Sequence, residues 1–163
     1  MSLSREIVAS YRGPGRVVRR LLVSGQREGR ALAILMGACV IVFVAQWPRL
    51  AREAHLTEQE LNPLLGGALL GWVFIAPLFF YALALIVHQI SRLFGGRGSG
   101  YGARIALFWA FLASTPLILL HGMVAGFIGP GPGLAGVGVL WSAVFLWFWG
   151  AGLREAEWGE SAA

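Results

Sequence analysis

The sequence predicts an all-α transmembrane protein: a bundle of four helices with both termini in the cytoplasm, preceded by a short amphipathic helix at the membrane surface. Composition points to this class, because 57% of the 163 residues are apolar or aromatic and only 13% are charged. Soluble domains carry about 25% charged residues. The mean hydropathy of +0.69 agrees. Long runs without charge also alternate with short charged segments, as polytopic membrane proteins require.

Residues 1–30 form a basic segment that we expect in the cytoplasm. Within it, Pro14 favours a helix start and Gly25 a helix end, which predicts a helix at about 14–24. Its valines and leucines share one helical face and its arginines fill much of the rest. Such a helix lies in the headgroup region of a membrane. Binding of a partner protein through the same face is the alternative.

The transmembrane domain is expected at 31–153, because a span needs about 20 mostly apolar residues. Pro77 and Pro116 should bend the second and third helices. The alternating sequence "GPGPG" cannot continue a helix and should separate the third from the fourth. A short acidic tail, 154–163, follows in the cytoplasm. The four helices are predicted at about 31–48, 63–91, 103–127 and 134–153.

Arginine placement predicts the orientation. The first thirty residues hold seven arginines, the loop after the second span holds three, and Arg154 follows the fourth span. Only Arg49 and Arg52 fall on the opposite side of a four-helix bundle. Arginine gathers on the cytoplasmic side of membrane proteins. The arginines expected to contact lipid headgroups are Arg16, Arg19, Arg20, Arg92, Arg97 and Arg104.

Small residues recur four positions apart along the predicted spans. Such pairs let two helices approach closely, either inside one bundle or between two proteins. The internal role is the interpretation we favour. The candidates for helix packing or for an interface are Gly67, Gly71, Gly122, Gly126, Gly138 and Ser142.

The sequence offers little chemistry at membrane depth. The middle of each predicted span has no acidic or basic residue, which argues against a proton relay or an intramembrane protease. We expect no catalytic residue, cofactor or metal, because His88 and His121 fall at different depths and His55 lies in an outer loop. The glycine-rich loop "GGRGSGYG" lacks the lysine and the preceding strand of a phosphate loop. A nest for an anionic headgroup remains open there, and nucleic acid is not expected as a partner.

A long apolar helix ends "HQISRLFGG" and is followed by "RGSGYGARIALFWAFLASTPLILL". This resembles the Yip1-domain family of polytopic membrane proteins, in which a helix runs into a Gly-Gly turn and the next helix carries a proline. The matching positions here are Gly95, Gly96, Ser99, Tyr101 and Pro116. The resemblance covers about residues 17–154, and the chain ends about where the family's fifth helix would begin. It implies a membrane protein without catalytic residues.

These observations predict a non-catalytic integral protein of a bacterial inner membrane. It would act as a scaffold or accessory subunit that associates with another membrane protein, with lipid, or with itself. A small oligomeric transporter or channel, using Ser114, Thr115 and His121, is the alternative. A lipid-modifying enzyme would have to use His55 and the glutamates of the outer loop.

Overall fold

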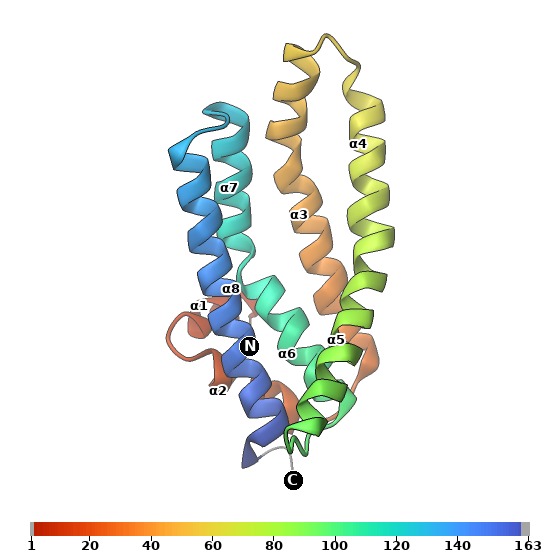
Figure 1. The fold of residues 1–163 in the computed structure, drawn as a ribbon, viewed down its shortest axis with the longest axis vertical. Coiled ribbons are helices and arrows are strands. Elements are labelled where there is room, and N and C mark those ends of the chain that lie inside the picture. Colours follow the sequence, from red (N-terminus) through yellow and green to blue (C-terminus); the bar gives the residue numbers. More distant parts are fainter. Residues whose placement is uncertain (1, 161–163) are drawn as a thin grey trace.

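In the computed structural model, which describes residues 2–160, every regular element is a helix (Figure 1). Two short helices come first and pack beside the lower half of the longer ones in this view. The elements are α1 (Leu3–Ser10), α2 (Pro14–Val23), α3 (Glu28–Leu56), α4 (Leu61–Leu69), the π-helical segment η1 (Leu70–Ile75), α5 (Ala76–Leu93), α6 (Gly100–Ala113), α7 (Thr115–Phe127) and α8 (Pro132–Trp158).

Three helices in the described residues are long and apolar enough to cross a membrane: Glu28–Leu56, Leu61–Leu93 and Pro132–Trp158. A fourth span results if α6 and α7 count as one, although they are bent by 43°. The expected single helix at about 103–127 is therefore two helices. The side chains at the break explain how the chain tolerates it, because Ser114 and Thr115 donate hydrogen bonds to the carbonyls of Phe111 and Leu112.

The long helices extend beyond the ranges expected from the sequence. The first span was expected to stop at Pro48, but α3 contains this proline and continues to Leu56. Charged residues end an apolar run without ending a helix, so the helix continues into the polar region. Likewise α8 continues to Trp158, which makes residues 154–158 of the expected tail helical.

Pro77 is accommodated by η1, the π-helical segment that directly precedes α5. A proline ring crowds the carbonyl four residues earlier and has no N–H to donate to it. The wider π turn falls where this crowding occurs, so the second span continues from Leu61 to Leu93.

Helix α6 is the centre of the fold. All but two of its residues are buried, and it packs against α2, α3, α5 and α8. Phe111 stacks on Phe80 with ring centroids 4.4 Å apart, and it also contacts the rings of Trp72 and Phe145. By contrast, only 6% of the most apolar window of α8 is buried. The side chains of α8 therefore largely face outward, as lipid-exposed side chains do.

Helix α2 lies where the sequence predicts a helix at about 14–24, but its apolar face has a different use. Val17 and Val18 are fully buried, and α2 packs against α8 and α6. Gly152 of α8 lets this happen, because an added Cβ there would lie 3.0 Å from a methyl group of Val18. The expectation that this face inserts among lipid headgroups is therefore wrong for the two valines.

Candidate functional site

The end of the bundle that carries the α5–α6 loop, the lower end in Figure 1, contains a buried pair of ionisable side chains. His88 of α5 and Glu157 of α8 approach to 2.6 Å between Nδ1 and Oε1, and Glu157 is fully buried. The backbone N–H of Arg97 donates to the carbonyl of Glu157 over 2.8 Å. The sequence placed His88 near a helix end and Glu157 in a solvated tail, and did not pair them.

The glycine-rich loop closes over this pair, and its glycines are needed for close approach. A Cβ on Gly96 would lie 2.9 Å from Glu157 Oε2, and one on Gly98 would collide with the carbonyl oxygen of Ala156. Gly95 has a φ of 85°, a conformation that side chains disfavour. Tyr101, just beyond the loop, is buried in the core. The loop therefore seals one end of the bundle against α8.

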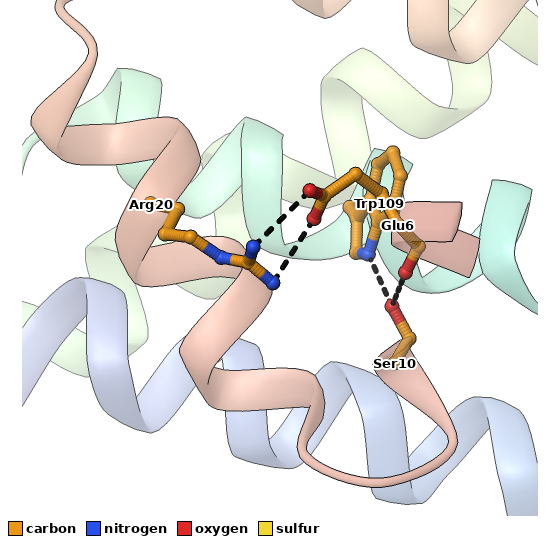
Figure 2. Close-up of polar contacts among 4 residues, drawn as sticks. All are labelled: Glu6, Ser10, Arg20 and Trp109. Atoms are coloured by element: carbon orange, nitrogen blue, oxygen red, sulfur yellow. Dashed lines mark hydrogen bonds and ion pairs between the residues drawn. The ribbon is translucent and has the colours of Figure 1, made fainter. Parts of the chain in front are cut away.

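A second polar cluster holds α1 on α6 (Figure 2). Trp109 donates through Nε1 to the hydroxyl of Ser10 over 2.9 Å, and that hydroxyl donates to the carbonyl of Glu6 over 2.9 Å. Glu6 also pairs with Arg20 of α2 at 3.1 Å. We call these contacts the α1–α6 clamp. It ties the N-terminal helices to the centre of the fold.

Tyr11, the residue that follows α1, adds a further tie to the same region. Its hydroxyl donates to the carbonyl of Ala113 over 3.0 Å, at the break between α6 and α7. Burial raises the pKa of Tyr11 above its ordinary value, so the hydroxyl stays protonated and can donate at neutral pH. The ring of Tyr11 also packs edge-on against Phe148 of α8.

The clamp leads to a stability prediction. Ser10→Ala leaves the buried indole N–H of Trp109 without its partner, and an unsatisfied buried donor costs about 1–3 kcal/mol. We expect the free energy of unfolding to fall by about this amount, measured by circular dichroism during denaturation in detergent. Ser4→Ala, on the exposed side of the same helix, should change it by less than about 0.5 kcal/mol. Equal effects of the two substitutions would contradict the clamp.

A basic cavity of about 290 Å³ lies between α1 and α2. Its lining includes Arg5, Arg12, Arg16 and Arg20. Of the other arginines expected at headgroups, Arg19 pairs with Glu155 and Glu160, and Arg104 pairs with Glu28. The side chains of Arg92 and Arg97 are exposed at the α5–α6 turn.

A cavity of about 540 Å³ lies among α3, η1, α6, α7 and α8. Aromatic and aliphatic side chains line most of it, together with Gln46 and His121. Gly138 and Ser142 also line it, and the Ser142 hydroxyl donates to the Gly138 carbonyl of its own helix.

The remaining small residues fall into two groups. Gly122 and Gly126 of α7 pack directly on the backbone of α3 at Ala45 and Pro48. Gly67 and Gly71, in contrast, have open space where a Cβ would stand.

Pro116 occupies the first turn of α7, where its missing N–H removes no helical bond. His55 and Arg52 line a separate cavity between α3, α4 and α7. Residues 2–160 contain no group of three or more His, Cys, Asp or Glu side chains arranged to hold a metal.

Together these features describe an all-helical protein whose long apolar helices are suited to crossing a membrane several times. Comparisons of the chain with protein-family models, with curated proteins and with solved structures find no match. The resemblance to the Yip1-domain family therefore rests on the sequence motifs alone.

Proposed function

We propose that the chain is a non-catalytic integral protein of a bacterial inner membrane, of the Yip1 type. Both termini lie in the cytoplasm, and the protein acts as a scaffold or accessory subunit that binds another membrane protein. The arginine-rich segments at one end of the bundle support this orientation. The exposed lateral surface of the second span supports the proposal of a protein partner.

One observation carries the proposal: α4 and η1 contain no buried residue, although both belong to a membrane-crossing helix. Gly67, Leu70, Gly71 and Phe74 follow helical spacing on this helix, and we call them the α4–η1 face. Leu70 and Phe74 are 56% and 61% exposed, and a Cβ added at either glycine would meet no other part of the protein. Glycines one turn apart, flanked by large apolar side chains, suit close packing with a helix of another protein.

The polar groups of the bundle favour this proposal over a transporter or an enzyme. The hydroxyls of Ser114 and Thr115 are occupied by backbone carbonyls at the bend, so they serve the fold. The pair of His88 and Glu157 is buried beneath the glycine-rich loop, where a substrate would first have to displace that loop.

Site-specific photo-crosslinking tests the α4–η1 face. The chain has no lysine, so amine-reactive crosslinkers are poorly suited to it. We expect p-benzoylphenylalanine in place of Leu70, at native expression levels, to crosslink to a distinct membrane protein identified by mass spectrometry. The matched control is the same photoreactive residue in place of Leu146 of α8, which is 59% exposed and outside the face. It should yield lipid adducts or about tenfold less of this product, because helix packing acts only at contact distance.

A second variant keeps the experiment decisive. Gly67→Ile fills the open space on the α4–η1 face and should remove most of the crosslink formed from position 70. Gly136→Ile, at an equally open glycine of α8, should leave it intact. Equal crosslinking from positions 70 and 146, or only lipid products from both, would refute the protein partner.

A further inference from the structure

The basic cavity between α1 and α2 has the charge and shape of an anion site. We propose that it binds the phosphate of an anionic membrane lipid. The inference goes beyond the proposed function, because it requires no protein partner. Four arginines line a volume of about 290 Å³ together with Val8, Ala9 and Gly13. A guanidinium group presents its donors as a planar fork that matches phosphate oxygens in pairs.

Among the described residues, the cavity has more arginines than carboxylates paired with them. Glu6 is paired with Arg20, one of the four lining arginines. Within residues 2–160, no ion pair joins Arg5, Arg12 or Arg16 to a carboxylate. Like charges held close together repel one another, and an anion bound among them removes that repulsion. A phosphate group supplies both the charge and several acceptor oxygens.

The surroundings of the cavity favour a lipid over a free anion. Val8 lines the cavity and is 62% exposed, and Leu3 on the same helix is 54% exposed. Val23, at the end of α2, is 74% exposed. Exposed aliphatic side chains beside arginines are typical of helices that lie at the membrane surface, where the arginines reach phosphates and the aliphatics reach acyl chains.

The cavity is also held in shape. The α1–α6 clamp fixes α1 through Ser10 and Trp109, and the pair of Glu6 with Arg20 fixes α2 against α1 (Figure 2). Gly13 leaves room for Arg16, because an added Cβ would lie 3.0 Å from Arg16 Nε. A site whose donors are already placed loses less entropy when it binds a ligand.

Native mass spectrometry of the purified full-length chain tests the proposal, with phosphatidylglycerol and phosphatidylcholine as probes. We expect wild-type protein to bind phosphatidylglycerol at least about tenfold more tightly than phosphatidylcholine. Arg12→Gln combined with Arg16→Gln should lose at least about tenfold of the phosphatidylglycerol affinity. The matched control, Arg27→Gln combined with Arg154→Gln, removes the same charge from exposed positions outside the cavity and should change the affinity less than about twofold.

Two further measurements test the geometry of the guanidinium groups and distinguish a lipid from free phosphate. Arg12→Lys combined with Arg16→Lys keeps the charge but loses the forks, so its affinity should fall between wild type and the glutamine variant. On wild-type protein, short-chain phosphatidylglycerol should compete at concentrations at least about tenfold below those of inorganic phosphate, because only the lipid has acyl chains that can contact the exposed side chain of Val8. This competition measurement uses only wild-type protein, so its result does not depend on whether a variant folds.

The proposal is overturned if the control pair loses as much affinity as the cavity pair, since binding would then follow net charge alone. It is also overturned if the lysine variant binds as wild type does, or if inorganic phosphate competes as well as the lipid. Because none of these readouts involves a membrane protein partner, failure here leaves the α4–η1 face to be judged by crosslinking.

Discussion

Glu157→Ala is expected to lower the free energy of unfolding by about 3 kcal/mol or more, because it removes a fully buried side chain and leaves the buried imidazole of His88 without its hydrogen-bond partner. His88 then loses the contact made at 2.6 Å, and the last turn of α8 loses a fully buried side chain. Denaturation in detergent, followed by circular dichroism, measures the change. Glu160→Ala is the control from the same acidic stretch, since Glu160 is 87% exposed and should contribute less than about 0.5 kcal/mol.

A double-mutant cycle tests whether the two side chains act as a pair. Replacing both His88 and Glu157 with leucine leaves neither polar side chain buried without a partner, and such replacements are often tolerated. We expect the double variant to be more stable than the sum of the two single losses predicts, by at least about 1 kcal/mol. Strict additivity would mean that the close contact contributes no coupling, and that Glu157 matters only for packing.

The membrane-crossing helices could be predicted because bilayer thickness imposes a simple rule on the sequence. Runs of about 20 apolar residues are too long to be accidental, and each marks a helix or, for α6 and α7, a bent pair of helices. The sequence "GPGPG" separates α7 from α8, since Gly129 and Gly131 adopt positive φ there. Helix ends were less predictable, because hydropathy reports the edge of the hydrocarbon and not the end of the hydrogen-bonded backbone.

The buried pair could not be predicted from charge pattern alone. Glu157 lies in a short acidic stretch with Glu155 and Glu160, and all three look like solvated tail residues in the sequence. Which of them becomes buried depends on the continuation of α8 to Trp158 and on where the α5–α6 loop meets it. The useful signal was the cluster of glycines, because Gly96 and Gly98 are spaced to let another backbone approach.

The packing of the N-terminal helices was likewise not predictable from the sequence pattern. An amphipathic segment predicts that its apolar face is covered, but not by what. Lipid was the expected cover for α2, whereas α8 and α6 cover Val17 and Val18. Helix α1 was not predicted, because eight residues of mixed character carry little periodic signal and owe their position to Ser10 and Tyr11.

The second large effect is expected at the contact between α3 and α7. An alanine Cβ at Gly122 would lie 2.9 Å from the carbonyl carbon of Ala45, and one at Gly126 would lie 2.6 Å from the carbonyl carbon of Pro48. Neither backbone can yield without separating the helices. Gly122→Ala and Gly126→Ala should each lower the free energy of unfolding by about 1–3 kcal/mol, the usual cost of overpacking.

The sign of this effect makes the test strict. Alanine is a better helix former than glycine by about 1 kcal/mol, so Gly→Ala stabilises a helix wherever space allows. Gly136 of α8 has open space around it, and Gly136→Ala should therefore raise the midpoint of thermal unfolding in detergent. The same substitution at Gly122 should lower it. If Gly122→Ala also stabilises the protein, α3 and α7 do not meet at these glycines, and the small residues of α7 would then be free to form an interface with another protein.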